Sequence, residues 1–290
     1  MTPKHLLLTL ALVAVLGIAG FFYTSRSSSG GTTSSPKEIP LTSTTETKVA
    51  QKTEALKEYN PPADPATPGI LKGVVKYDGE PPEPKFKEVP PNTEGCHANV
   101  ADESLVVDKA TKGLKWAIIR ITDVTPKEAL PKPAKPYQID QKGCTFTPHV
   151  VIVPPGTDLQ ILNPDKILHN IHTQPYDLIN PPQNMAVTGP LTYKAKWLKD
   201  AELIEIKCDV HGWMKGFIVC HDPRYCAVTG ADGTFEIKNL PPGKYQVNVW
   251  QESFGNYFPD KTKKTETFSV EIKAGATTDL GEMKFAPKAK

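Results

Sequence analysis

A thiol, an imidazole and a thioether lie within one short segment, Cys208-Asp-Val-His211-Gly-Trp-Met214. A second imidazole, that of His169, comes from an earlier stretch whose apolar pattern is typical of a strand. One thiolate, two imidazoles and a weak thioether form the donor set that suits copper in both of its common oxidation states, as in electron-transfer centres. The residues therefore predict one mononuclear copper site, with His169, Cys208, His211 and Met214 as its metal ligands.

The segment before the cysteine alternates between apolar and polar residues, as a strand with one buried face does. Ile204 and Ile206 alternate with charged residues, so Cys208 continues their inward-facing register. The same period recurs along most of the chain beyond residue 67, and turns rich in Gly and Pro separate the segments. We therefore predict an all-β fold of sandwich type. The first strand pattern is formed by Leu71, Val74, Val75 and Tyr77. Further alternating sets are Tyr193, Ala195 and Trp197; Tyr245, Val247 and Val249; and Phe268, Val270 and Ile272.

Composition and charge exclude several classes of protein. The chain has 34 basic and 32 acidic residues, a net charge of +2, so it lacks the concentrated positive charge of a protein that binds nucleic acid. We expect no nucleic-acid partner. The 29 prolines and 20 glycines would interrupt long helices and central strands, which excludes large helical bundles and large parallel sheets.

The N-terminal end predicts export. Residues 6–23 are apolar except for Thr9 and would span about 27 Å as a helix, close to the thickness of a bilayer core. Residues 1–23 are therefore interpreted as a membrane anchor or a signal peptide. Residues 24–66 are rich in Ser, Thr and Pro and poor in large apolar side chains, which predicts a disordered linker. The location expected is periplasmic or otherwise extracytoplasmic, anchored to the inner membrane through residues 6–23, or secreted if the helix is cleaved.

The region 136–222 resembles the cupredoxins, most closely the amicyanin and plastocyanin group. The resemblance rests on the C-x-x-H-x-x-M spacing, on the interval from Asn163 to His169, on the His169-Asn170 pair and on Phe146-Thr-Pro148. It implies a Greek-key β-sandwich that holds one type 1 copper ion.

The same resemblance assigns a role to each residue of the site. His169, Cys208 and His211 would be the equatorial ligands and Met214 the weak axial ligand. The backbone N–H of Asn170 would donate a hydrogen bond to the cysteine sulfur and so tune the site without binding the metal. One departure is Val210, which stands where the family usually has proline and adds a backbone N–H beside the sulfur.

The function that the resemblance implies is transfer of single electrons between redox proteins, with no catalysis by the chain itself. Its partner would be a cytochrome or a dehydrogenase, electrons would leave through His211, and Trp213 would belong to the docking surface. Trp116 and Trp197 are expected in the core. Two alternatives remain open, namely a copper chaperone or storage protein, and a cell-surface scaffold with a structural metal site.

Four cysteines and five histidines remain outside the predicted ligand set. In an oxidising compartment the cysteines are expected to form disulfides, and we favour the pairs Cys96–Cys144 and Cys220–Cys226 over other pairings, which the sequence alone leaves open. His172 is three residues from His169, so on a strand it would face the other side. His172, His149, His221 and His97 are therefore expected not to bind the metal.

The region 223–290 resembles a different module, the carboxypeptidase regulatory-like domain, which has a small transthyretin-like or immunoglobulin-like β-sandwich. The resemblance rests on an Asp232-Gly233 turn, a Phe235-Glu-Ile237 strand and a Pro241-Pro-Gly243-Lys-Tyr245 turn. The first strand of such a domain is missing here, but Gly73-Val-Val-Lys-Tyr-Asp-Gly79 supplies one far upstream. We therefore hypothesise that residues 67–135 and 223–286 form one sandwich, into which the cupredoxin-like region 136–222 is inserted.

Overall fold

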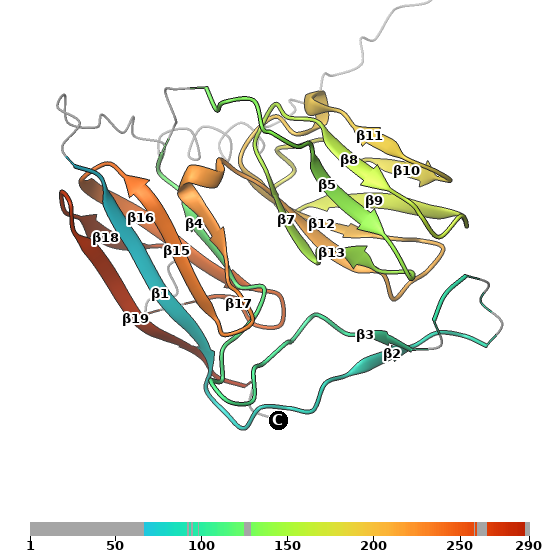
Figure 1. The fold of residues 1–290 in the computed structure, drawn as a ribbon, viewed down its shortest axis with the longest axis horizontal. Coiled ribbons are helices and arrows are strands. Elements are labelled where there is room, and N and C mark those ends of the chain that lie inside the picture. Colours follow the sequence, from blue (N-terminus) through green and yellow to red (C-terminus); the bar gives the residue numbers. More distant parts are fainter. Residues whose placement is uncertain are drawn as a thin grey trace, which may run out of the picture. The chain divides into compact units, whose positions relative to one another are not determined.

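The computed structural model describes residues 67–91, 93, 95–97, 99–124, 129–257, 259 and 266–287. Within them every regular element is a strand, apart from two 3-10 turns (Figure 1), which confirms the all-β prediction. This part of the chain contains no helix that is long and apolar enough to cross a membrane. The expected anchor or signal peptide at residues 6–23 and the linker at residues 24–66 lie outside the described residues.

One sandwich is built from strands that come from both ends of the described chain, and we call it the split sandwich. Its strands are β1 (Gly69–Tyr77), β4 (Ile118–Ile121), β14 (Cys226–Val228), β15 (Thr234–Leu240), β16 (Gly243–Gln251), β17 (Gly255–Asn256), β18 (Phe268–Ile272) and β19 (Thr277–Phe285). In one sheet β1 lies between β15, to which it is antiparallel, and β19, to which it is parallel. In the other sheet β4 lies between β14 and β16. These are the strand contacts that the insertion hypothesis requires.

The second sandwich is formed by the continuous stretch between β4 and β14, and we call it the inserted sandwich. Its strands are β5 (Tyr137–Gln141), β6 (Phe146–Thr147), β7 (Val150–Val153), β8 (Leu159–Leu162), β9 (His169–Pro175), β10 (Asn184–Val187), β11 (Leu191–Tyr193), β12 (Glu202–Lys207) and β13 (Lys215–Cys220). They form a five-stranded sheet in the order β10-β9-β12-β13-β7 and a four-stranded sheet in the order β11-β8-β5-β6. The apolar core lies between these two sheets and includes Ile139, Ile161 and Ile204.

Local chemistry explains the strands and turns of the split sandwich. Leu71 and Val75 are fully buried while Lys72 is exposed, so β1 has one inward and one outward face. Gly233 ends the turn before β15 with a φ of +78°, and a Cβ at this position would lie 2.2 Å from the carbonyl oxygen of Val75. Only glycine fits a backbone that is both left-handed and this close to a neighbouring strand.

A third apolar cluster buries the outer face of the five-stranded sheet. Phe217 and Leu203 of the inserted sandwich pack there with Ile118 and Trp250 of the split sandwich. The ring centroids of Phe217 and Trp250 are 5.0 Å apart. Strand β13 is therefore buried on both faces beyond Lys215, whereas on the outward face of β12 only Leu203 is buried and Glu205 and Lys207 are partly exposed.

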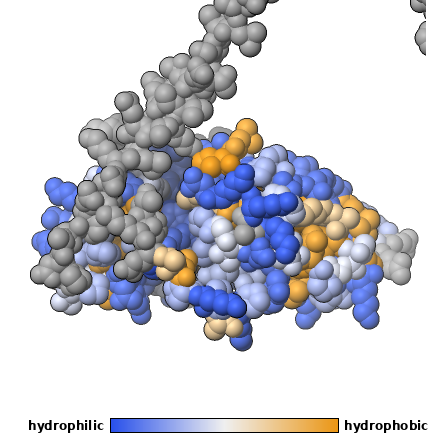
Figure 2. Space-filling model, turned by 90° about the horizontal axis from the view of Figure 1, so that it is seen from above, coloured by the Kyte–Doolittle hydropathy of each residue, from blue (hydrophilic) through white to orange (hydrophobic). Residues whose placement is uncertain are grey.

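A short hairpin leaves the split sandwich between β1 and β4. It consists of β2 (Phe86–Glu88) and β3 (Asn99–Ala101), which pair antiparallel, and we call it the arm (Figure 1). Over the face drawn in Figure 2, hydrophilic residues predominate and hydrophobic residues form small separate patches.

Two expectations about local structure are wrong. Residues 193–197 do not form one strand, because β11 ends at Tyr193 and Ala195–Trp197 form a 3-10 turn. Cys220 and Cys226 are both free and buried, so the expected disulfide between them is not formed. Cys220 ends β13 and faces the core of the inserted sandwich, whereas Cys226 begins β14 and packs in the cluster between the two sandwiches. The turn that joins them directs their side chains into different clusters.

Candidate metal centre

The four predicted ligands come from one end of the five-stranded sheet. His169 is the first residue of β9, Cys208 directly follows β12, and Met214 directly precedes β13. Strands β9 and β12 are antiparallel neighbours, with Lys207 opposite His172. The start of β9 and the end of β12 therefore lie at the same end of the sheet. The 208–214 loop connects β12 to β13 at this end.

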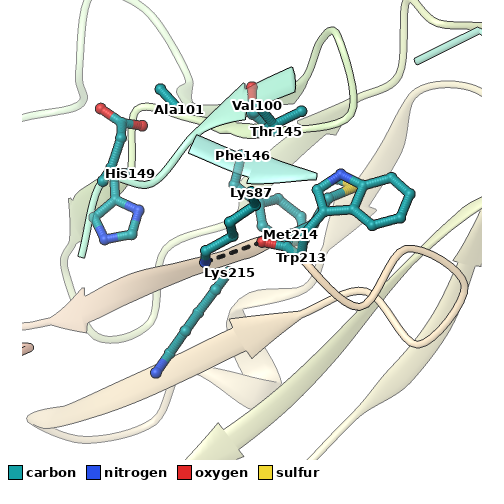
Figure 3. A pocket seen from close by; sticks show the side chains of 10 residues that line it. Lys87, Val100, Ala101, Thr145, Phe146, His149, Trp213, Met214 and Lys215 are labelled. Atoms are coloured by element: carbon teal, nitrogen blue, oxygen red, sulfur yellow. Dashed lines mark hydrogen bonds between the residues drawn. The ribbon is translucent and has the colours of Figure 1, made fainter. Parts of the chain in front are cut away.

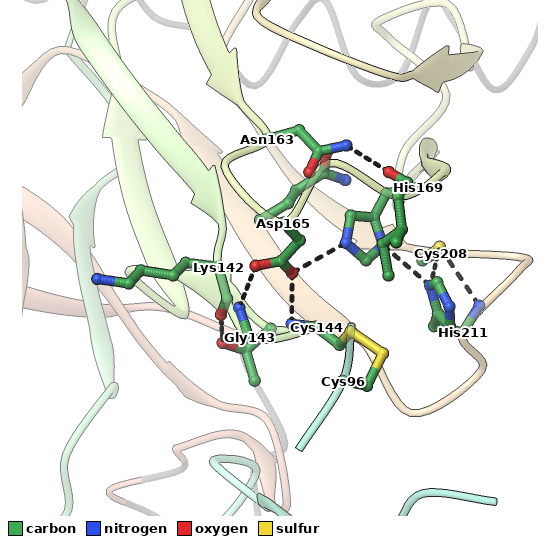
Figure 4. A network of polar contacts seen from close by, with 12 residues as sticks. Cys96, Lys142, Gly143, Cys144, Asn163, Asp165, His169, Cys208 and His211 are labelled. Atoms are coloured by element: carbon green, nitrogen blue, oxygen red, sulfur yellow. Dashed lines mark hydrogen bonds and ion pairs between the residues drawn. A yellow bond between two sulfur atoms is a disulfide. The ribbon is translucent and has the colours of Figure 1, made fainter. Parts of the chain in front are cut away.

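The two histidines and the cysteine converge on one point inside the protein. The Nδ1 atoms of His169 and His211 are 2.9 Å apart, and the Cys208 Sγ lies 3.8 Å from the His211 Nδ1. One donor atom from each of the three residues falls within 4.8 Å of the others (Figure 4). Their side chains are buried, with relative exposures of 0% for His169, 1% for Cys208 and 6% for His211. The structure thus brings together the three equatorial residues predicted from the sequence.

Met214 closes the loop that carries Cys208 and His211. Its N–H donates to the His211 carbonyl at 2.8 Å, and its carbonyl accepts from the Cys208 N–H at 3.3 Å. Its side chain is 1% exposed and belongs to the same buried cluster as Cys208. The loop is therefore short, hydrogen-bonded across its base and folded inward.

Hydrogen-bond donors surround the cysteine sulfur. The backbone N–H of Asn170 lies 3.5 Å from the Cys208 Sγ, and that of His211 lies 3.4 Å from it. Burial alone would raise the pKa of Cys208, but the His169 side chain and the N–H groups of Asn170, His211 and Val210 outweigh burial and lower that pKa. The thiolate, which is the form that binds metals, is therefore favoured at this position.

The pKa values of the two imidazoles are shifted in opposite directions. Burial would lower the pKa of His169, but interactions with Cys208 and Asp165 outweigh burial and raise it. The pKa of His211 is lowered, first by burial and then by the neighbouring charge of His169. His211 is therefore kept neutral, the state in which an imidazole nitrogen can bind a metal.

Asp165 is a member of the site that sequence reasoning missed. Its carboxylate accepts hydrogen bonds from the N–H groups of Gly143 and Cys144 at 2.7 and 2.8 Å, and it lies 3.1 Å from the Nε2 of His169. A carboxylate on the outer nitrogen of a ligand histidine fixes the ring and its tautomer. The available signal was an acidic residue four positions before His169.

Asn170 is held by its side chain as well as by its strand. The Asn170 side-chain oxygen accepts from the Asp209 N–H at 2.6 Å, and its amide nitrogen donates to the Asp209 carboxylate at 3.0 Å and to Asn184 at 2.7 Å. This network fixes the distance between β9 and the start of the loop. It thereby keeps the Asn170 N–H aimed at the sulfur, which is the role that the family resemblance implied.

The other histidines among the described residues lie outside the ligand cluster, as expected. The His172 Nδ1 contacts the Asp209 carboxylate at 3.0 Å. His149 is buried between the sandwiches, 2.8 Å from the Glu252 carboxylate. The ring nitrogens of His221 are within hydrogen-bond distance of the backbone carbonyls of Asp222 and Ile121.

A small pocket beside Met214 connects the ligand loop to the arm and to the interface between the sandwiches. Lys87 of the arm donates from its Nζ to the Trp213 carbonyl at 3.3 Å (Figure 3). Lys215, the residue after Met214, lies 3.1 Å from Glu252 of the split sandwich. Neither contact was foreseen from the sequence, because both partners come from segments remote in the chain.

Trp116 and Trp197 pack against apolar clusters, as expected, and Trp213 lies beside His211. The Trp213 ring lies 5.2 Å from the His211 ring between centroids, and its Nε1 donates to the Cys144 carbonyl at 3.2 Å. Trp197 packs against Tyr193 and the core of the inserted sandwich, and Trp116 packs in the cluster between the sandwiches.

Comparison with protein families gives one match. Residues 192–280 match the family described as polysaccharide lyase family 4, domain II. The matched stretch begins in β11 of the inserted sandwich and ends in β19 of the split sandwich. The family comparison thus supplies a different relative from the carboxypeptidase regulatory-like domain that the C-terminal motifs resemble. No curated protein matches the sequence.

Several solved structures resemble part of this chain. A Cu-containing nitrite reductase from Thermus scotoductus SA-01 is 22% identical over 34% of this chain and 25% of its own, with a TM-score of 0.27. The match thus spans a quarter of the reductase. A purple cupredoxin from Nitrosopumilus maritimus is 17% identical over 29% of this chain and 98% of its own, with a TM-score of 0.25. The amicyanin from Paracoccus versutus is 16% identical over 36% of this chain and 97% of its own, with a TM-score of 0.25. With TM-scores this low, the assignment of metal ligands rests on the geometry of this chain's own residues.

Proposed function

We propose that the chain is an exported type 1 copper protein that carries single electrons between redox partners and catalyses no substrate reaction of its own. The observation that carries this proposal is the convergence of the Cys208 sulfur and the two Nδ1 atoms of His169 and His211 in the protein interior. Met214 in the same buried cluster would be the weak axial ligand.

The donor set fits copper on chemical grounds. A thiolate, two imidazoles and a thioether suit both Cu(I) and Cu(II), whereas the described residues place no carboxylate in the cluster of His169, Cys208 and His211. The pKa of the thiol and that of His211 are both lowered, which favours the metal-binding form of two of the donors. A copper ion held there would accept and release one electron. The chain's own residues would hold the ligands fixed, orient His169 through Asp165 and exclude water.

Rigid burial of the ligands favours electron transfer over a role as a copper chaperone or store. A protein that delivers copper must let its partner reach the metal, but His169, Cys208 and Met214 are at most 1% exposed. The backbone N–H groups that contact the sulfur also fix the geometry around it. A fixed geometry lowers the reorganisation that accompanies each electron, which benefits a carrier.

Location and partner belong to the same proposal. The disulfide Cys96–Cys144 supports export, because disulfides persist in oxidising compartments. Residues 6–23 would anchor the chain to the inner membrane unless they are cleaved. The partner would be a redox protein such as a cytochrome or a dehydrogenase, reached through His211 and the neighbouring Trp213.

The test uses the protein with one equivalent of Cu(II), beside Cys208→Ala. The expected result is an intense thiolate-to-copper absorption band and a narrow hyperfine splitting in electron paramagnetic resonance, both absent from the variant. A band of equal strength in Cys208→Ala would refute the ligand assignment. If the band is present, reduced protein mixed with an oxidised c-type cytochrome should transfer electrons. Transfer of Cu(I) without electron exchange would instead identify a chaperone, and partner binding that is unchanged in Cys208→Ala would identify a scaffold.

A further inference from the structure

The arm is seated directly on the loops that hold the ligand cluster. Besides the Lys87 contact with Trp213, Gly95 lies so close to Ile167 that a Cβ would be 3.0 Å from the Ile167 Cγ2 atom. The His97 ring lies against Gly143, where a Cβ would be 3.1 Å from its Cδ2 atom. These contacts fix the position of the arm without any covalent bond.

Between these contacts the disulfide Cys96–Cys144 joins the arm to the inserted sandwich, with Cα atoms 5.4 Å apart. The two sulfurs and a ring nitrogen of His211 all lie within 4.8 Å of one another (Figure 4). Trp213, which contacts the His211 ring, donates to the Cys144 carbonyl and so fixes this side of the loop. The sulfurs of Cys96 and Cys144 therefore lie next to the ligand cluster, close to its residue His211.

Reduction would convert this sulfur pair into two thiols beside an imidazole, a donor set that is selective for soft Cu(I). We propose that Cys96 and Cys144, once reduced, form with His211 a second Cu(I) site that adjoins the primary ligand cluster and shares His211 with it. The existence of this second site does not depend on the proposed function. Only its consequence does, namely that copper bound by Cys96 and Cys144 passes to Cys208 through His211.

The reductant required is a dithiol, either a protein with two neighbouring cysteines or a small molecule. Cys96 is half-buried and Cys144 is fully buried, so the attacking thiolate reaches the Cys96 sulfur. A mixed disulfide forms there, and Cys144 leaves as a thiolate that takes up a proton. The second thiol of the reductant then attacks the reductant sulfur that is bonded to Cys96, and the Cys96 thiol is released. Two electrons have moved to the protein and the reductant has become a disulfide. Binding of Cu(I) then releases the thiol protons.

The seating of the arm keeps the two thiols together after reduction. The contacts of Lys87, Gly95 and His97 are non-covalent and are not broken by the reduction itself, so they keep Cys96 beside Cys144 at a high effective concentration. The other two free thiols offer no equivalent site, because burial raises the pKa of both Cys220 and Cys226 to about 12 and they lie in separate clusters.

The experiment measures Cu(I) affinity in the Cys208→Ala background, where the primary site lacks its thiolate. The protein is reduced with dithiothreitol, freed of it without oxygen and titrated with Cu(I) against a chromogenic Cu(I) chelator, beside its own oxidised form. We expect the reduced form to bind one equivalent about 100-fold more tightly than the oxidised form. Equal affinity in the two redox forms would overturn the proposal, and this comparison needs no further substitution in the chain.

Two further variants assign the ligands. Cys96→Ser/Cys144→Ser, added to Cys208→Ala, retains Cys220, Cys226 and Met214 and should show no gain on reduction, so a gain that persists there also overturns the proposal. His211→Ala in the same background should lose part of the gain, and an unchanged gain would refute the shared histidine. Cys96→Ser/Cys144→Ser with Cys208 intact should keep the blue absorption band. Loss of the second site and failure of the proposed electron-transfer site are thereby distinguished.

Discussion

Cys208 and Cys226 are both buried, free thiols at strand ends, yet their surroundings give them opposite acid–base properties. The Cys208 sulfur accepts backbone N–H groups and lies beside two imidazoles, and its pKa is lowered. Cys226 packs among apolar residues such as Ile118 and Trp250, and burial raises its pKa to about 12. Cys220, in the core of the inserted sandwich, behaves like Cys226.

The difference shows that burial alone does not make a metal ligand. Removing a thiol from water penalises its charged form at all three positions, and only hydrogen-bond donors or a neighbouring positive charge reverse that penalty. At Cys208 these donors come from β9 through Asn170 and from the 208–214 loop through His211. The candidate metal centre therefore depends on how the start of β9 and the 208–214 loop meet at one end of the five-stranded sheet.

The largest expected effect comes from exchanging sulfur for oxygen at each thiol. Cys208→Ser should abolish the thiolate-to-copper absorption band completely, because a hydroxyl at this position stays protonated and gives no such transition. Cys226→Ser should leave the intensity and energy of the band unchanged per folded molecule. Visible absorption after addition of Cu(II) measures both variants, and a weakened band in Cys226→Ser would break the contrast between the two thiols.

The alkaline stability of the protein should depend on Cys226 with a defined sign. Its folded pKa is about 12 against 9.0 for an ordinary thiol, so the stability it contributes is complete below pH 9 and is lost as the pH rises towards 12. The expected slope is about 1 kcal/mol of unfolding free energy per pH unit in this window.

Cys226→Ala should therefore show a shallower decline than the unmodified protein when the free energy of unfolding is measured by denaturant titration between pH 8.5 and about 11. Ionisation of lysines and tyrosines changes the unfolding free energy of both proteins equally, so it cancels when the two pH profiles are subtracted. For Cys208, whose pKa is lowered, the sign is reversed, since its stabilising contribution is lost as the pH falls. Parallel declines in Cys226→Ala and the unmodified protein would contradict the raised pKa.

Asp165→Asn should weaken copper binding while the blue absorption band persists. The carboxylate orients His169 and accepts two backbone N–H groups, and loss of such a partner typically reduces metal affinity by about 10- to 100-fold. Competition with a Cu(II) chelator measures the change. Asp279→Asn removes a carboxylate from the surface of the split sandwich and is the charge-matched control, so an equal loss in the two variants would argue against a specific role for Asp165.

The smallest effect is expected at Val210, where one N–H contributes to the lowered pKa of Cys208. Val210→Pro removes that donor. The thiolate carries more negative charge beside Cu(I) than beside Cu(II), so the loss destabilises the reduced form by about 1 kcal/mol more and lowers the reduction potential by about 40 mV. Val210→Ala retains the N–H and should leave the potential unchanged. A redox titration followed at the blue band distinguishes the two outcomes.

The convergence of His169, Cys208 and His211 could be predicted because its signals are local. Alternation carries Cys208 inward after Ile206, and the spacing within one loop brings His211 and Met214 to the same end of the sheet. The path of the chain through the split sandwich also left a local signal, since a first strand at residues 73–77 had to find partners elsewhere. Each of these inferences starts from short motifs that are complete within one segment.

The missed features depend on contacts between remote segments. Cys220 and Cys226 flank a short turn that suggests a disulfide, but their side chains are buried in different apolar clusters. The cluster that contains Cys226 forms only where the two sandwiches meet. The role of Asp165 depends on the 143–144 backbone, which arrives from another sheet. The alternation at residues 193–197 was misleading because Trp197 reaches the core from a 3-10 turn.

The pairing of β1 with β19 sets the order in which the chain can fold. Ile70 lies opposite Thr277, so the sheet that holds these strands closes only when residue 277 is available to pair with β1. The inserted sandwich is continuous in sequence and needs no residue beyond Cys220 to complete its own two sheets. Contacts that are close in sequence form faster than distant ones. We therefore expect the inserted sandwich to fold first, before β1 pairs with β19.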